Sequence, residues 1–249
     1  MDMLLKEKFM AGWEKYFPGA ELPVSFYYTD KAPGPEYMRS PAGHQCMIGV
    51  LNRARRGEAL SFDAASIGCF GGKRYAGFRA ELAPNFEYFL SCGIPGKLEG
   101  ERYKKSPQLV AEMMKAARKF AAPGKYIVFK RFDTLAEGDE PDAAVFFAPP
   151  DVLAGLFTLA NYDGAEPNGV ICPFSAGCGS IIQYPYQEKG APRPRAVLGM
   201  FDVSARPFVE KGVLTFAVPM EKLARMTDSM DESFLITGSW EKVKARLTA

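Results

Sequence analysis

Residues 169–186 read Gly-Val-Ile-Cys-Pro-Phe-Ser-Ala-Gly-Cys-Gly-Ser-Ile-Ile-Gln-Tyr-Pro-Tyr, and the rest of the chain is organised around this stretch. An apolar run enters it, a turn of small residues follows with a thiol at its apex, and an apolar, aromatic run leaves it. The glycines on both sides of Cys178 allow the backbone to turn tightly and to approach another group closely. A shorter version, Ala-Ser-Ile-Gly-Cys-Phe-Gly-Gly, occupies residues 65–72. The two Gly-Cys turns indicate where a site would lie.

The overall composition excludes several classes of protein. The chain has 249 residues, 47% of them hydrophobic, which suffices for one large or two small domains. Its 31 basic and 29 acidic residues give a formal net charge of +2, so there is no electrostatic basis for a nucleic-acid or membrane partner. No apolar run approaches the roughly 18 residues of a membrane span, and charges in the first eight residues interrupt any signal-peptide core. We therefore expect a cytoplasmic protein.

The cysteines do not suggest a disulfide framework or a metal centre. There are five, an odd number with irregular spacing, which is typical of a reducing compartment. The chain has one histidine, His44, and no Cys-x-x-Cys pair. Zinc and iron–sulfur sites normally use tighter, paired spacings, so we expect no metal. A redox pair of Cys172 and Cys178, the two closest in sequence, is an alternative.

Hydrophobic periodicity predicts alternating helices and strands. Ser106 followed by Pro107 has the N-cap and first-turn chemistry of a helix start, whereas residues 73–105 fit no regular element. The predicted helices are 3–17, 44–56, 106–120, 151–163, one opened by Pro219 and one capped by Ser239. The predicted strands are 23–28, 60–62, 126–129, 143–148, 170–172, 196–201 and 213–218.

The order strand, helix, Gly-Cys turn, strand occurs twice. Strand 24–28 matches strand 143–148, and helix 44–56 matches helix 151–163. We interpret this as an internal duplication, with an N-terminal helix over 1–20, a first half over 21–140 and a second half over 141–249. The predicted fold class is α/β or α+β, with two pseudo-symmetric halves, each a small sheet flanked by helices, packed as one unit. The alternative is the ordinary alternation of any α/β chain.

The doubled pattern also carries a resemblance to a known family. Together with Gly-Cys-Gly-Ser at 177–180 and Met-Phe-Asp-Val-Ser-Ala-Arg at 200–206, it resembles the domain of unknown function 169 family of archaea and anaerobic bacteria. The resemblance covers the chain from about residue 20 onward. It implies a cytosolic protein and no particular reaction, because the family has no established activity.

Cys178 is the strongest single candidate for a catalytic or ligand-binding residue. A helix starting near Gly179 would present free N–H groups that favour an anion and lower the pKa of the thiol. Cys178 would then be a nucleophile or a ligand contact. The other interpretation is a small thiol buried in the core. No Gly-x-Ser-x-Gly motif is present, and the one histidine is far away in the sequence.

The first Gly-Cys turn continues into Lys73 and Arg74. It is not a Walker A motif, because Ile67 and Arg74 stand where glycine and Ser or Thr are required. A glycine-rich anion nest with basic side chains beside it is one interpretation, and an ordinary turn is the other. Farther on, Asp202 and Arg206 are four residues apart, a spacing that suits an ion pair or leaves Arg206 to clamp an anion.

We therefore expect the protein to bind a small, anionic metabolite or cofactor, of a kind the sequence does not identify, in a cleft between the halves. Two alternatives stay open: a thiol-dependent enzyme or redox protein using Cys178, and an interaction module without a ligand. The predicted ligand-binding residues, drawn from both turns and the 200–206 motif, are Gly68, Cys69, Gly71, Gly72, Arg74, Gly177, Cys178, Gly179, Ser180 and Arg206.

Overall fold

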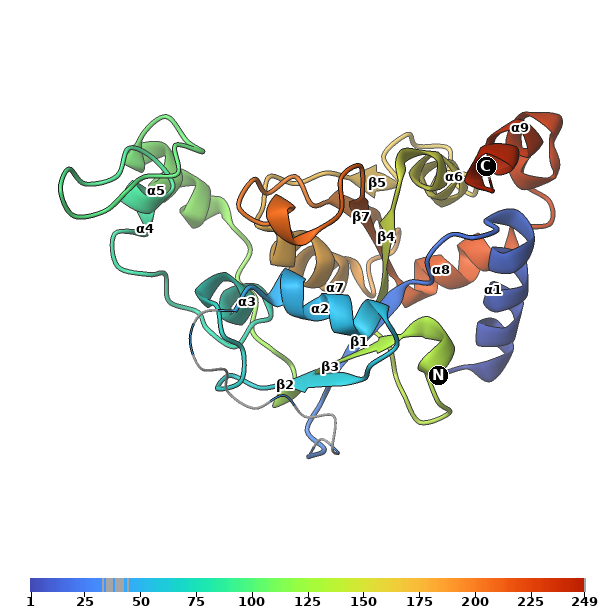
Figure 1. Ribbon diagram of the computed structural model, residues 1–249, viewed down its shortest axis with the longest axis horizontal. Helices are drawn as coiled ribbons and strands as arrows, with labels where there is room; N and C mark the ends of the chain where they lie inside the picture. Colours follow the sequence, from blue (N-terminus) through green and yellow to red (C-terminus); the bar gives the residue numbers. More distant parts are fainter. Residues whose placement is uncertain (33, 35–37, 39–42, 44, 249) are drawn as a thin grey trace.

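Seven strands form one sheet in the computed structural model, which describes residues 1–32, 34, 38, 43 and 45–248. Their sequences are rich in β-branched and aromatic residues, which suit a pleated, buried surface. The order across the sheet is β2-β3-β1-β4-β7-β6-β5 (Figure 1). In chain order the strands are β1 Val24–Thr29, β2 Leu60–Phe62, β3 Tyr126–Arg131, β4 Ala143–Ala148, β5 Val170–Ile171, β6 Ala196–Gly199 and β7 Leu214–Pro219.

Strand β1 lies in the interior of the sheet, beside the middle strand β4, and pairs antiparallel with two strands that are distant in sequence. Val24 is opposite Arg131 of β3 on one side and Val145 of β4 on the other. Strand β7 continues the antiparallel pattern beside β4, and β6 beside β7. Only the last pair, β5 with β6, is parallel. The carboxyl ends of β5 and β6 therefore meet at the same edge of the sheet.

Each face of the sheet carries its own buried cluster. On the side that we call the α2 face, Phe26 and Val145 pack under α2 (Met47–Arg55), α3 (Phe70–Tyr75) and α7 (Tyr184–Glu188). On the opposite side, the α1 face, Phe146 and Phe216 pack under α1 (Met3–Tyr16), α6 (Pro150–Ala160), α8 (Met220–Asp228) and α9 (Gly238–Leu247). Because successive strand residues point to opposite faces, the unbroken apolar run of β4 serves both clusters.

The α1 face is held together by aromatic side chains. Helix α1 starts at Asp2, whose carboxylate accepts the N–H groups of Leu4 and Leu5, as an N-cap should. Trp13 stacks on Phe17 with ring centroids 4.5 Å apart, and the Trp240 indole donates to the Tyr16 carbonyl at 3.0 Å. Within the described ranges, no helix combines the length and the apolar character needed to cross a membrane.

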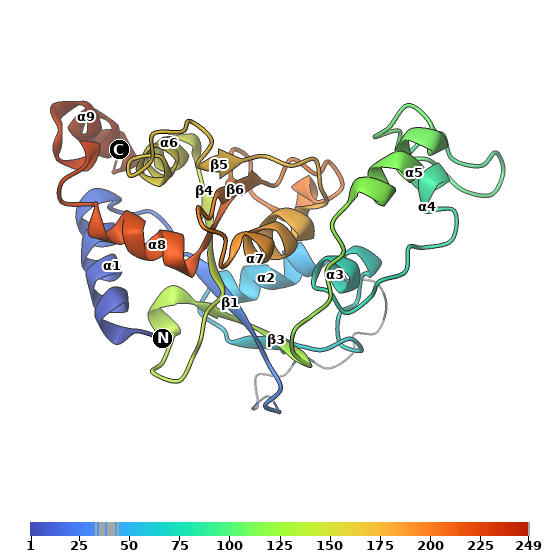
Figure 2. The same cartoon turned by 180° about the vertical axis from the view of Figure 1, so that it is seen from behind.

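A separate projection, which we call the lobe, spans residues 80–117 and stands away from the sheet (Figures 1 and 2). It carries α4 (Phe86–Phe89) and α5 (Pro107–Ala116). The two segments that lead to it are joined at their base, where the Ala122 N–H donates to the Gly77 carbonyl at 2.9 Å. Gly77 has φ +79°, and a Cβ there would lie 2.3 Å from the Ala122 nitrogen, so only glycine fits at this junction.

The predicted mixed α/β class is confirmed, with some differences in detail. The helix that Ser106 caps ends at Ala116 rather than 120. Strand β6 ends at Gly199 rather than 201. The helix predicted from residue 44 begins at Met47, and His44 lies outside the described residues. The stretch 73–105, which fitted no element, contains part of α3, all of α4 and part of the lobe's loops.

The predicted duplication is not confirmed. The strands of both expected halves share one sheet, with β1 and β4 side by side at its centre. The two helices that were matched in sequence lie on opposite faces, α2 in one cluster and α6 in the other. A two-fold axis between the halves would place them on the same face. The pseudo-symmetry and the boundary at residues 140–141 stay predictions.

Candidate functional site

The two Gly-Cys turns lie against each other on the α2 face. Cys69 and Cys178 are each 6% exposed and belong to one buried cluster, with the half-buried Cys46 packed against it. The turns that we expected to converge are therefore neighbours. The space between them is filled by side chains, so a ligand cannot lie in the seam itself.

Several of the predicted glycines serve this close packing. The Gly72 N–H donates to the Cys69 sulfur at 3.2 Å, and a Cβ on Gly72 would lie 2.8 Å from that sulfur and 2.9 Å from Cγ2 of Ile67. A Cβ on Gly179 would lie 1.9 Å from the Ser175 hydroxyl oxygen and 2.9 Å from the Tyr75 ring. These positions admit no larger residue because another chain segment already occupies the volume.

Cys178 is followed by a single turn of π-helix, Gly179–Gln183, instead of the α-helix start that the sequence suggested. The Tyr184 N–H donates to the Gly179 carbonyl, five residues back. The buried Ser180 hydroxyl donates to the Gly177 carbonyl at 2.8 Å, so Ser180 is occupied inside the turn. Turns of π-helix are rare in proteins, and many of those that occur lie at functional sites.

The environment of Cys178 keeps its thiol protonated. Burial raises its pKa well above the usual value, and the neighbouring Cys69, Cys46 and Asp202 raise it further. Burial likewise raises the pKa of Cys46. The thiolate is the reactive form of cysteine, so this environment opposes nucleophilic chemistry. Among the described residues no group of three Cys, Asp, Glu or His side chains has the geometry of a metal site.

Asp202 and Arg206 do not form the predicted ion pair. The Asp202 carboxylate accepts the Gly177 N–H at 3.0 Å and the Ser204 hydroxyl at 2.7 Å, so it fixes the second Gly-Cys turn. The Arg206 guanidinium donates instead to the carbonyls of Val213 and Glu210. Arg206 therefore stabilises its own loop. The Arg206 N–H donates to the Asp202 carbonyl at 3.1 Å, as in one helical turn, but the side chains do not pair because each bonds to other groups of the loop.

The outer side of α3 is more open. A Cβ on Gly71 would meet no atom within 4 Å, and Gly68, Lys73 and Arg74 are all partly exposed. Arg74 donates to the Ala80 carbonyl at the foot of the lobe. Of the predicted residues, Gly68, Gly71 and Arg74 are therefore accessible, whereas Cys69, Gly72, Cys178, Gly179 and Ser180 are buried.

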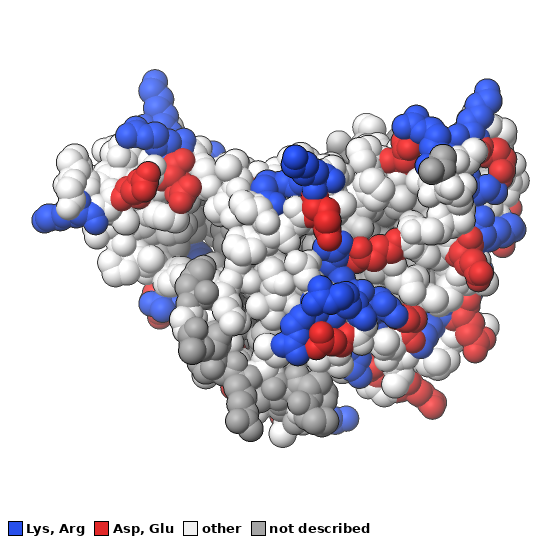
Figure 3. Space-filling view, in the orientation of Figure 1, with Lys and Arg blue, Asp and Glu red and all other residues white. Residues whose placement is uncertain are grey.

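The lobe meets the sheet across this region, a contact that the sequence did not predict. The Lys104 ammonium lies 4.1 Å from the centre of the Phe174 ring, and Phe174 is 58% exposed. Figure 3 shows the surface hollowed between the lobe and the body of the protein. Phe174 stands four residues before Cys178, and an aromatic residue so near the Gly-Cys turn was a signal that the sequence offered.

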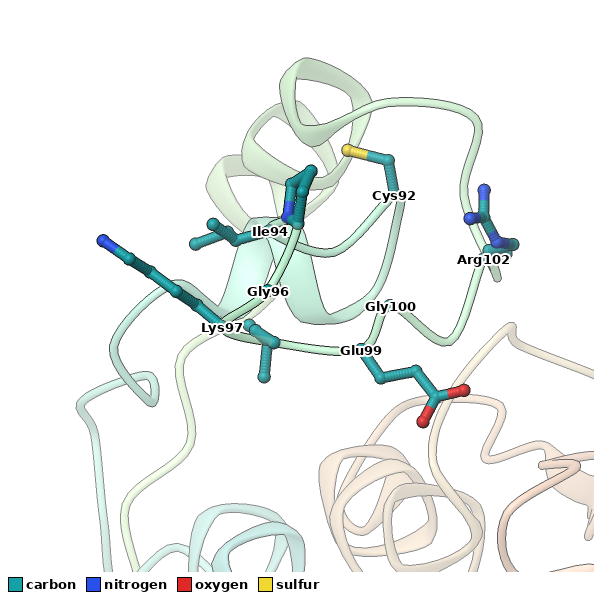
Figure 4. A pocket seen from close by; sticks show the side chains of 9 residues that line it. Cys92, Ile94, Gly96, Lys97, Glu99, Gly100 and Arg102 are labelled. Carbon is teal, nitrogen blue, oxygen red and sulfur yellow. The ribbon is translucent and has the colours of Figure 1, made fainter.

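A second concavity lies on the lobe itself, a cavity of about 520 Å³ lined by residues between Cys92 and Arg102. Figure 4 shows the Lys97 and Arg102 side chains extending away from each other, and Glu99 pointing toward the body. No set of charged groups converges in this cavity. The hollow between lobe and sheet is therefore the stronger candidate site.

Comparison with known proteins gives one match. No curated protein and no solved structure matches the chain. A family model does match, over residues 20–229, and is described as uncharacterised ArCR, COG2043. That range includes both Gly-Cys turns, the whole sheet and the lobe. The family expected from the 177–180 and 200–206 motifs is confirmed: the chain belongs to the domain of unknown function 169 (DUF169) family.

Proposed function

We propose that the protein binds a small anionic molecule in the hollow between the lobe and the α2 face. The observation that carries the proposal is the contact of Lys104 with Phe174, which places a lobe cation directly over an exposed group beside the second Gly-Cys turn. A ligand in this position would touch both the lobe and the sheet.

Basic side chains on the sheet side of the hollow support a negative ligand. Lys73 and Arg74 lie on α3, and neither is paired with a carboxylate among the described residues. Arg79 lies over the Phe70 ring at 4.5 Å from its centre, and its only carboxylate neighbour in the described part of the chain, the largely exposed Glu81, is 3.9 Å away. Cations without strong partners raise the local concentration of anions, most of all where low-dielectric walls surround them.

The thiol-dependent alternative is less well supported. Cys178 is buried and its pKa is raised, so at neutral pH it holds its proton and is shielded from any substrate. In the proposed function the buried Cys69 and Cys178 pack beneath the site, and Asp202 holds the turn at Gly177. The interaction-module alternative requires no ligand at all.

A thermal-shift titration tests the proposal. The probes are inorganic phosphate, citrate, a nucleoside monophosphate and an aromatic carboxylate. A ligand that binds only the folded protein at 100 times its Kd adds about 2.7 kcal/mol of stability, a readily measured rise in Tm. Lys104→Gln should weaken the best probe about tenfold. Lys105→Gln, which removes an exposed charge next to it in sequence, should leave the affinity unchanged.

Two results would count against the proposal. One is a flat Tm with every probe, which would favour the interaction module. The other is an equal loss of affinity in Lys104→Gln and Lys105→Gln, which would indicate a general charge effect rather than a site.

A further inference from the structure

The hollow lies outside the carboxyl ends of the parallel strands β5 and β6, where Ile171 is opposite Val197. Each strand is followed within three residues by an exposed aromatic side chain: Phe174 after β5, at 58% exposure, and Phe201 after β6, at 56%. The two loops are tied together by the hydrogen bond from the Gly177 N–H to Asp202. The crevice outside the carboxyl ends of parallel strands is the usual place for ligands in α/β sheets.

The lobe presents polar groups to these loops. Lys104 lies over the Phe174 ring. Next to it, the Tyr103 hydroxyl is shielded from solvent and makes no hydrogen bond of good geometry to any described residue. Burial and the nearby Glu101 raise the pKa of Tyr103, which also faces Ser204 and Asp202 of the sheet side. A shielded hydroxyl whose contacts with Glu101 and Ser204 are poorly aligned is incompletely satisfied, so a ligand atom that bonds to it in good geometry would gain from the contact.

Resting on the proposed function, we infer that the ligand carries an aromatic ring beside its negative charge. The ring stacks on Phe174, the charge pairs with Lys104, and a polar atom of the ligand bonds to the Tyr103 hydroxyl. Stacking of a ring on an exposed aromatic side chain is tolerant of ring type, and the flexible lysine stem can move aside to admit it. An aliphatic anion would use Lys104 alone and leave Phe174 exposed.

A matched pair of probes separates the ring from the charge: 1-naphthyl phosphate and inorganic phosphate, titrated calorimetrically into the wild-type protein. We expect 1-naphthyl phosphate to bind at least tenfold more tightly. Phe174→Ala should remove that tenfold preference and keep the affinity for phosphate, whereas Lys104→Gln should weaken both probes. Phe157→Ala removes a comparably exposed ring, at 48%, from α6 on the α1 face, and should change neither affinity.

Each other outcome overturns the inference. Equal affinities for the two probes in the wild type, or a preference that survives in Phe174→Ala, would refute the aromatic class while leaving an anion site in place. Binding of neither probe would also refute the inference, and the proposed function fails with it if the Tm stays flat with every probe of the thermal-shift titration. Because Phe174 is largely exposed, the Tm of the unliganded Phe174→Ala protein should stay within about 2 °C of the wild type, which shows that the variant is folded.

Discussion

Two neighbouring glycines in α3 give a direct test of how the first Gly-Cys turn is packed. Gly71 and Gly72 lie in the same short helix, Phe70–Tyr75, and both belong to the predicted ligand-binding set. Replacing either by alanine lowers the backbone entropy of the unfolded chain, which favours the helix by up to about 1 kcal/mol. That gain is common to both variants, so it cancels in their difference.

The difference is then the cost of the added methyl group. At Gly71 the methyl group would meet nothing within 4 Å. At Gly72 it would lie 2.8 Å from the Cys69 sulfur, 2.9 Å from Ile67 Cγ2 and 3.2 Å from Met47 Cβ, and all three residues are buried. Overpacking a core costs about 1–3 kcal/mol. We expect Gly72→Ala to be less stable than Gly71→Ala by about 2 kcal/mol.

For a chain of this length, that difference corresponds to about 6 °C in Tm. Urea unfolding followed by circular dichroism gives the free energies, and calorimetry gives the melting temperatures. If Gly72→Ala had the same unfolding free energy and the same melting temperature as Gly71→Ala, the packing between the two Gly-Cys turns would be looser than described. A ligand could then bind between the two turns, and the hollow beside the lobe would no longer be the stronger candidate site.

Two further results are expected. At pH 7.5 iodoacetamide should alkylate the exposed Cys92 and Cys172 before Cys178, because Cys178 is buried and burial raises its pKa well above the usual value. Burial raises the pKa of Cys172 too, but that thiol is accessible. Peptide mapping that found Cys178 modified first would favour the thiol-dependent alternative. Burial alone would raise the pKa of Asp139, but hydrogen bonds from neighbouring groups, including Lys130, hold it below the usual value. A carboxyl group whose pKa is lower in the folded protein stabilises the fold at pH values above its unfolded pKa of about 4, and this stabilisation is lost as the pH falls through the folded-state pKa. The wild type should therefore lose more unfolding free energy between pH 5 and pH 3 than Asp139→Asn. Equal losses in the two proteins would show that Asp139 does not contribute.

Local sequence patterns predicted most of the individual elements. The strands at 23–28 and 143–148 were recognisable because each is a short run of apolar and aromatic residues that ends in a proline-rich loop. Pairing was not predictable in the same way. Nothing in Val24–Thr29 indicates that its neighbours are β3 and β4, more than 90 residues farther along the chain, because pairing depends on packing between distant segments.

The candidate site was predictable only in part. The glycines around Cys69 and Cys178 correctly marked a place of close approach, but the same pattern arises whether a ligand or another chain segment approaches, and here a segment does. Asp202 and Arg206 share one helical turn, as their spacing suggested, but their side chains bond to other groups of the loop, which the spacing alone does not indicate. Lys104 stands in a charged run without periodicity, so only the folded lobe reveals that it reaches Phe174.

The interior position of β1 in the sheet has a consequence for how the chain folds during synthesis. Strand β1 leaves the ribosome early, yet the two strands that flank it are completed only at residues 131 and 148. The edge that pairs with β3 stays open until residue 131, and the edge that pairs with β4 stays open until residue 148. An open strand edge carries unpaired N–H and C=O groups, which invite pairing with other chains. Contacts between such distant segments also slow folding. We expect truncated chains that end near residue 140 to aggregate, and nascent chains of that length to depend on chaperones.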